Sequence, residues 1–186
     1  MKLSHFPVSL SRHSITNMKR TLIVGFGNLD RTDDGVAFHV VNAFRRRLGL
    51  AALDQNSTGL DDLGKSVDSV FISQLVPEMI DLLDGYDRII FVDAHVDPAL
   101  DELYCVAVST EEAGLTFTHH MSPATLLAFY KAIHGRNLEG HLVSILGHNF
   151  DFNHNLSKET QSLVEPAVDR ILSLNGYKVK TNDPAT

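Results

Sequence analysis

Residues 22–37 read LIVGFGNLDRTDDGVA, and this stretch decides the fold of the chain. A short apolar run ends in a Gly-x-Gly-Asn turn, crosses a polar segment and places Asp33 and Asp34 at the start of an apolar-periodic segment. In α/β proteins, ligands gather at the carboxyl ends of strands, and glycines there allow tight turns and close approach to a ligand. The pattern therefore predicts a strand that delivers two carboxylates to such an edge.

Four further apolar runs have the length and composition of strands, and helical patterns lie between them. The expected strands are 21–26, 69–74, 88–93, 103–109 and 142–147. The expected helices are 34–48, 77–83, 122–133 and 157–174. This alternation predicts an α/β fold: a three-layer sandwich with a five-stranded, largely parallel, twisted sheet and helices on both faces.

The chain has 186 residues, of which 44% are hydrophobic, enough for one domain with its own core. No repeat or linker divides residues 19–174, which we expect to form a single domain. Residues 1–18 are predicted to be a disordered leader, and a misassigned start codon is an alternative interpretation of this segment. Residues 175–186 are predicted to be a flexible tail.

Composition excludes several classes of protein. The formal net charge of −7 disfavours nucleic-acid binding, which needs a basic surface. The basic run Arg45–Arg47 closes a predicted helix, where the helix dipole favours cations. No apolar run approaches the roughly 20 residues that span a bilayer, and no secretory signal is present. The single Cys105 forms no intramolecular disulfide, which fits a reducing compartment. We therefore predict a cytoplasmic protein that binds neither nucleic acid nor membrane.

Polar residues gather at predicted strand ends and helix starts. Asn28, Asp33 and Asp34 follow the first strand, and Asp93 follows the apolar run 88–92. One aspartate of the adjacent pair is explained by capping a helix, which leaves the other for chemistry. Asp93 fits either a structural turn or metal ligation and acid–base work. His95 is expected to face solvent, and a position in which it supports the ligands of the site is the alternative.

A third set precedes the helix predicted at 122–133. His119 and His120 are adjacent, and because side chains alternate along an extended segment, at most one of them is expected to join a given site. One imidazole with two carboxylates suits a divalent first-row metal ion. Residues 147–155 also carry polar side chains, which would suit the rim of the same sheet edge. A loop that leads into the next helix explains them at least as well. Cys105 lies in the middle of a predicted strand and is expected to be a buried, inert thiol.

These motifs resemble the endopeptidases that mature [NiFe]-hydrogenases. The stretch 25–36, GFGNLDRTDDGV, is similar to the opening signature of that family. Weaker similarity includes 74–79, 90–94, His119 with Ser122-Pro123, and 147–156, so that it extends over about residues 19–174. The segment 74–78 reads QLVPE, where some members carry an acidic, Gly-rich stretch, and this leaves the partner hydrogenase undetermined.

The resemblance implies an enzyme that removes the C-terminal extension of a hydrogenase large-subunit precursor after nickel insertion. It also implies that the nickel is carried by the substrate and is not a permanent cofactor. Carried over by motif, the metal-contacting residues are Asp34, Asp93 and His119, with His120 as the alternative histidine. Asp34 and Asp93 are then the expected catalytic residues. The ion acts either as a Lewis acid or by activating a water molecule.

Two other functions compete with this hypothesis. The Gly25-x-Gly27 turn after a strand suggests dinucleotide binding, but Asp30 stands where the third glycine of that motif belongs, and carboxylates repel a pyrophosphate. The second alternative is a non-catalytic chaperone or inactive homologue that recognises the nickel site of its partner without cutting it.

Overall fold

The structure is a computed structural model that describes residues 19–112 and 121–177. One five-stranded sheet forms its centre, in the order β2-β1-β3-β5-β4. The strands are β1 Thr21–Phe26, β2 Val67–Ile72, β3 Arg88–His95, β4 Leu103–Ala107 and β5 Glu139–Leu146. Four of the strands, β2, β1, β3 and β5, are parallel to one another. The fifth described strand, β4, runs antiparallel to its neighbour β5. The predicted five-stranded, largely parallel sheet is confirmed.

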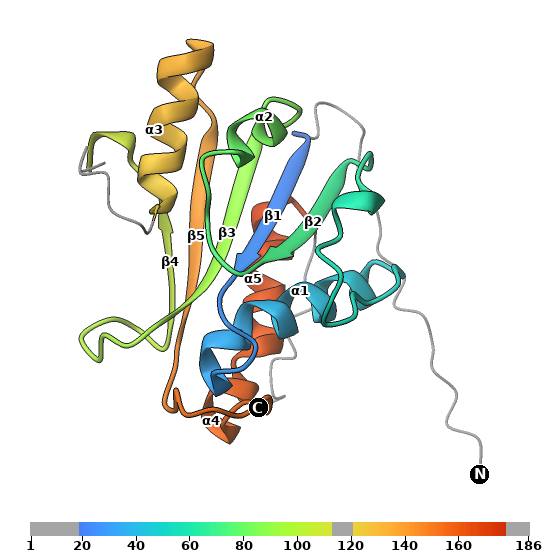
Figure 1. Cartoon of the computed structure of the whole chain (residues 1–186), viewed down its shortest axis with the longest axis vertical. Helices are drawn as coiled ribbons and strands as arrows, with labels where there is room; N and C mark the ends of the chain where they lie inside the picture. The colour runs from blue at the N-terminus through green and yellow to red at the C-terminus, as the bar shows by residue number, and fades with distance from the viewer. Residues whose placement is uncertain (1–18, 113–120, 178–186) are drawn as a thin grey trace, which may run out of the picture.

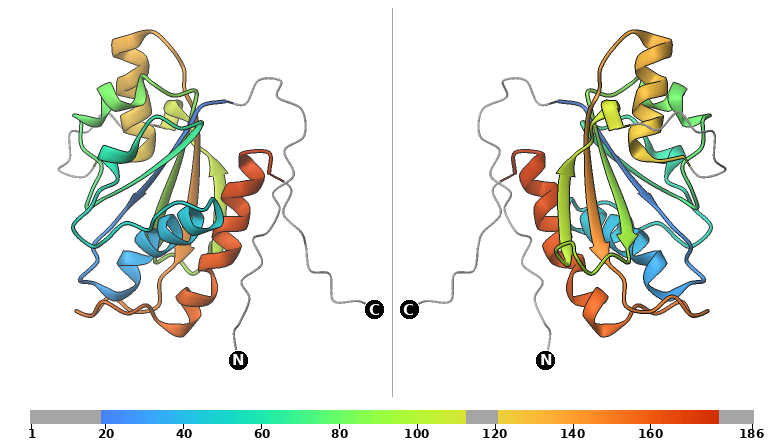
Figure 2. Two further views of the ribbon diagram at one scale, coloured as in Figure 1. Left: turned by 90° about the vertical axis from the view of Figure 1, so that its right-hand side faces the viewer. Right: turned by 90° about the vertical axis from the view of Figure 1, so that its left-hand side faces the viewer.

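Helices cover both faces of this sheet, as the two side views in Figure 2 show; Figure 1 labels the elements. The α-helices are α1 Val36–Arg47, α2 Met79–Leu83, α3 Pro123–His134, α4 Lys158–Ser162 and α5 Val164–Leu174. Three short 3-10 turns are η1 Thr32–Gly35, η2 Leu60–Asp62 and η3 Thr110–Glu112. The helices α1 and α5 pack on one face, and α2 and α3 pack on the other. The predicted three-layer sandwich is therefore also confirmed.

The strand β1, which lies between β2 and β3, shows how the apolar run produces this arrangement. Successive side chains of a strand point to opposite faces, so Leu22 and Val24 join the core under α2 and α3, while Ile23 joins the core under α1 and α5. All three are fully buried, and burying each such side chain stabilises the fold by about 1.5–3 kcal/mol. Packing on both faces fixes β1 and hence the loop that follows it.

Several elements differ from the sequence prediction in their bounds, and two of these differences have a clear physical reason. The helix predicted at 157–174 is divided at Leu163, because Pro166 has no N–H and its ring clashes with the carbonyl four residues earlier. The strand predicted at 142–147 begins three residues earlier, at Glu139. Glu139 is charged, but Arg88 of the adjacent β3 donates to its carboxylate at 2.8 Å. A cross-strand ion pair thus extends the strand beyond its apolar run.

The carboxyl end of the described chain, at Tyr177, packs against the core of the domain. The backbone N–H of Tyr177 donates to the carbonyl of Leu172 at 3.0 Å, which closes the end of α5. Residues 1–18 of the predicted leader and 178–186 of the predicted tail lie outside the described residues. No helix within the described ranges has the length and apolar character needed to cross a membrane.

Candidate functional site

The strand order creates one position where a ligand is expected. The chain leaves β1 towards α1 on one face and leaves β2 towards α2 on the other face, so the connections diverge around β1 and β3. In open parallel sheets, ligands bind beyond the carboxyl ends of the strands at such a switch point. β1 and β3 are directly paired, with Gly25 opposite Val92. The segments after these two strands carry Asp34 and Asp93.

The loop after β1 is shaped by close backbone packing. Gly27 has φ +145°, and a Cβ atom there would lie 2.0 Å from the carbonyl oxygen of Asp34. The backbone N–H of Asn28 donates to the carboxylate of Asp34 at 3.2 Å. The side-chain oxygen of Asn28 accepts from the N–H of Asp30 at 2.9 Å. The Gly-x-Gly-Asn turn therefore contacts both the backbone carbonyl and the carboxylate of Asp34, and these contacts fix its position.

Replacing Gly27 with alanine should reduce both stability and any activity that depends on Asp34. The new Cβ cannot fit against the Asp34 carbonyl, so the loop must move, and we expect a loss of about 2 kcal/mol or more in the free energy of unfolding. Gly64→Ala is the matched control, because Gly64 also has positive φ but open space around it. Thermal unfolding of both variants checks the prediction, and equal destabilisation would contradict it.

The adjacent aspartates have different structural roles. Asp33 is fully buried and its carboxylate accepts the backbone N–H groups of His148, Asn149 and Ser157 at 2.7–2.9 Å. The hydroxyl of Ser157 also donates to it, at 2.8 Å. Burial acts to raise the pKa of Asp33, but these hydrogen bonds outweigh burial and hold the pKa below its usual value. Asp33 is thus a structural anchor for the loop 147–157, and Asp34 is the half-buried partner left for a site.

Asp93 lies near the end of β3 and is half-buried. Burial, and to a smaller extent the negative charge of Asp34, raise the pKa of Asp93 to about 7 against the opposing effect of a hydrogen bond from the N–H of Ala94. A carboxyl group with such a pKa exchanges its proton near neutrality, as a general acid or base must. It is also disposed to bind a cation, which relieves the repulsion between the two carboxylates.

Asp34 and Asp93 line one cavity of about 530 Å³. Its other walls come from three segments, the turn after β1, the residues that follow β2 and the start of α3. These further lining residues are Phe26, Gly27, Asn28, Ser73, Gln74, Leu75, Met121, Ser122 and Pro123. Ser122 caps α3 by accepting the N–H of Thr125 at 3.1 Å. No Lys or Arg is among the described lining residues, so the two carboxylates have no cationic partner in the cavity.

The histidine of the predicted set is not placed. His119 and His120 both lie outside the described residues, which resume at Met121 in the wall of the cavity. Within the described ranges, no three His, Cys, Asp or Glu side chains gather in a way that would hold a metal ion. The structure therefore brings Asp34 and Asp93 to one cavity, and the assignment of His119 as a third ligand stays a prediction.

Three other sequence expectations have clear outcomes. His95 does not simply face solvent: it is half-buried, and its Nδ1 atom lies 3.0 Å from the hydroxyl of Ser144 on β5. Cys105 is half-buried on the edge strand β4, with its side chain against the α1–α5 core. Residues 147–157 form the loop into α4 and are not part of the cavity wall.

Ser73, Gln74 and Met121 line the cavity but were not among the predicted site residues. Ser73 and Gln74 follow the carboxyl end of β2, and the same strand-end rule that selects Asp93 would have selected them. Neither residue is titratable, and the predicted strand extended to Gln74. The sequence signal was therefore present at these positions, but the end of the strand was placed two residues too late.

Comparison with known structures agrees with this architecture. The chain is similar to the [NiFe] hydrogenase maturation protease HybD from Thermococcus kodakarensis, with 20% identity, a TM-score of 0.58, and coverage of 84% of this chain and 99% of that one. The hydrogenase maturating endopeptidase HybD from E. coli gives 20% identity, a TM-score of 0.60, and coverage of 86% and 95%. The [NiFe] hydrogenase maturation protease HycI from T. kodakarensis gives 16% identity, a TM-score of 0.58, and coverage of 85% and 94%.

These similarities establish a shared fold that extends over almost the whole length of each related structure. No protein-family model matches the sequence. No curated protein matches it either. The fold expected from the opening signature is thus the one observed.

Proposed function

We propose that this protein is an endopeptidase that removes the C-terminal extension of a [NiFe]-hydrogenase large-subunit precursor. The observation that carries the proposal is the convergence of Asp34 and Asp93 on one cavity at the switch point of the sheet. Three structures with this fold are named as hydrogenase maturation proteases or endopeptidases. The opening signature 25–36, which resembles that family, is the segment that builds one side of the cavity.

In this proposal the metal ion is nickel, which is part of the substrate. Asp34 and Asp93 supply two carboxylate ligands, and His119 supplies the imidazole, with His120 as the alternative. Imidazole and carboxylate are both competent ligands for divalent first-row metals. A cavity whose described walls carry two carboxylates and no Lys or Arg attracts a cation. Recognition of the ion then places the scissile peptide bond beside these carboxylates.

The proposed chemistry is hydrolysis of a peptide bond with the help of the bound ion. The ion polarises the scissile carbonyl or lowers the pKa of a water molecule, and both routes are compatible with the carboxylates of the cavity. Asp93, with a pKa of about 7, is suited to take a proton from that water when it is not itself engaged with the ion. Because the ligands must be deprotonated, recognition of the nickel-loaded partner should weaken as the pH falls below 7.

Processing of a nickel-loaded precursor is the direct test. The wild-type chain should shorten the large-subunit precursor from the same organism, and Asp34→Asn should lower the rate by about 10²-fold or more. Asp30→Asn is the matched control, because Asp30 is an exposed carboxylate in the same loop that lies outside the cavity wall. Mass spectrometry of the precursor measures both rates.

The outcomes separate the alternatives. A nickel-free precursor should remain uncut, which would show that the ion belongs to the recognised substrate. Binding of the nickel-loaded precursor without any cleavage would support the non-catalytic chaperone. An Asp34→Asn variant that cleaves as fast as Asp30→Asn would refute the assigned role of Asp34.

A further inference from the structure

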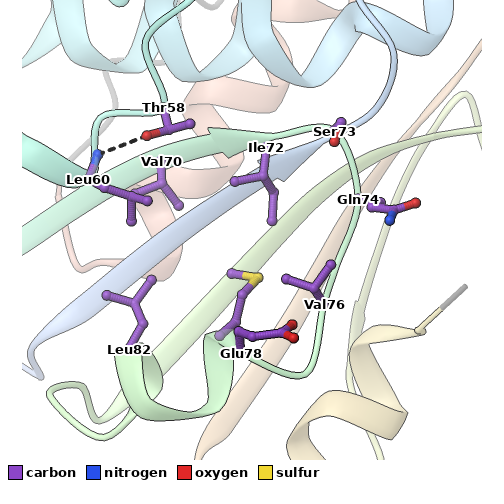
Figure 3. A pocket seen from close by; sticks show the side chains of 10 residues that line it. Thr58, Leu60, Val70, Ile72, Ser73, Gln74, Val76, Glu78 and Leu82 are labelled. Carbon is purple, nitrogen blue, oxygen red and sulfur yellow. Dashed lines mark hydrogen bonds between the residues drawn. The ribbon is translucent and has the colours of Figure 1, made fainter.

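A second cavity of about 420 Å³ lies between β2 and α2, next to the acidic cavity. Figure 3 shows side chains of the strand and the helix facing each other across it. Its walls are mainly apolar, and we call this cavity the apolar groove. The lining residues central to its character are Leu60, Val70, Ile72, Val76, Met79 and Leu82. Leu60 is 45% exposed and presents apolar surface to the groove.

The apolar groove is continuous with the acidic cavity. Ser73 and Gln74 line both spaces and form their common wall. Both residues are exposed, and within the described part of the chain their backbone groups make no hydrogen bonds to other backbone groups. Ser73 and Gln74 form a bend directly after β2, which is an edge strand of the sheet. Free backbone groups beside a sheet edge can hydrogen-bond to an extended polypeptide. The wall between the two spaces therefore has the chemistry of a peptide-binding edge.

We propose that the apolar groove binds an apolar side chain of the polypeptide substrate, close to the scissile bond. This inference rests on the proposed function, because the acidic cavity is where the bond would be cut. The substrate main chain crosses Ser73 and Gln74 in an extended conformation, and one large apolar side chain, such as leucine, enters between β2 and α2. The apolar groove thus selects which residue stands near the cleavage position.

The negative charges around the apolar groove limit which side chains a bound peptide segment can carry. Among the described residues that line the groove, Glu78 alone is charged, and it is exposed. The acidic cavity adjoining the groove carries Asp34 and Asp93, and the whole chain has a net charge of −7. An acidic side chain on the bound segment would meet repulsion from both directions. The expected occupant is therefore an apolar residue flanked by neutral or basic residues.

Leu60→Ser is the variant that tests the groove. It removes an exposed apolar wall with little risk to the core, and it should raise the KM for the precursor about threefold to tenfold while leaving kcat nearly unchanged. Val76→Thr, on the opposite wall, should raise KM in the same direction. The control is Ile133→Ser on α3, an equally apolar and 66% exposed site away from the groove. Equal KM values for Leu60→Ser and Ile133→Ser would overturn the proposal.

A binding experiment separates this inference from the proposed function. Acetyl-Gly-Ala-Leu-Ala-Gly-amide, titrated into the ¹⁵N-labelled full chain, should shift the amide signals of Ser73 and Gln74. The same peptide with Glu in place of Leu should not shift them. If the leucine peptide binds but no precursor is cut, the groove stands and the proposed function fails. If precursor is cut but the peptide leaves these signals unchanged, the groove proposal fails alone. A dimer that Leu60→Ser dissociates would assign the groove to a second copy of the chain and overturn the proposal.

Discussion

Replacing Asp93 with asparagine should abolish precursor processing and at the same time make the protein more stable. The activity should fall by about 10²- to 10⁴-fold, because the variant loses a metal-binding carboxylate that can also exchange a proton. The free energy of unfolding at pH 8 should rise by about 2 kcal/mol, which corresponds to about 4–8 °C in melting temperature. Thermal unfolding and mass spectrometry of the processed precursor measure the two effects.

The sign of the stability effect follows from the raised pKa. The carboxyl group of Asp93 has a pKa of about 7 in the folded chain, against 3.8 for its ordinary value. Between these two pH values the folded state binds more protons than the unfolded state, so the contribution of Asp93 to stability is complete below pH 3.8 and is lost as the pH rises through 7. The advantage of Asp93→Asn should therefore be largest at pH 8 and should disappear near pH 4.

Asp97→Asn provides the control for this prediction. Asp97 is an exposed carboxylate four residues further along the chain, and its oxygen accepts the N–H of Ala99 at 2.9 Å, a bond that asparagine retains. This variant should process the precursor at the wild-type rate and melt at the wild-type temperature at both pH values. An Asp93→Asn variant that melts below Asp97→Asn at pH 8 would show that the charge of Asp93 is stabilised by the fold, contrary to our assignment.

The sheet was predictable because its strands carry strong local signals. β1 begins and ends as predicted, at Thr21 and Phe26, since its apolar run is bounded by a charged residue and a glycine. The early start of β5 was not predictable, because Glu139 is favoured there by Arg88, which is 51 residues away in the sequence. The division of the last helix did have a local signal in Pro166. Long-range pairing thus determined the early start of β5, whereas the division of the last helix followed a local signal within an otherwise helical pattern.

The site was predictable only to the level of residue type. The sequence indicated that one of Asp33 and Asp34 is structural, but the choice depends on hydrogen-bond donors at 148–157, more than 110 residues later. Asp93 was identified because a polar residue at the end of a buried strand lies at the carboxyl edge of the sheet. Its strand, β3, is paired directly with β1. The apolar groove was not predicted, because its walls are ordinary core-type residues whose exposure is set by the packing of β2 against α2.

The second large effect is expected at Asp33, where alanine should destabilise the fold by about 3 kcal/mol or more. The change removes the fully buried carboxylate that accepts three backbone N–H groups of the loop 147–157. Asp34 is the next residue in the sequence, but Asp34→Asn should lose activity and still unfold close to the wild-type temperature. Denaturant unfolding at pH 7 measures the difference between the two variants.

The dependence of this loss on pH distinguishes an ionised anchor from a merely space-filling one. Because hydrogen bonds hold the pKa of Asp33 below 3.8, its stabilising contribution is present above that pH and is lost as the pH falls through the folded-state pKa. Asp33→Asn keeps the shape of the side chain but carries no charge, so its deficit against the wild type should be largest at pH 7 and should shrink in acid. As the pH falls, the stability of Asp33→Asn relative to the wild type should therefore rise towards zero. The stability of Asp93→Asn relative to the wild type should instead fall towards zero, so the two trends have opposite signs. If both differences varied with pH in the same sense, the division of the two carboxyl groups into one anchor and one reactive group would be wrong.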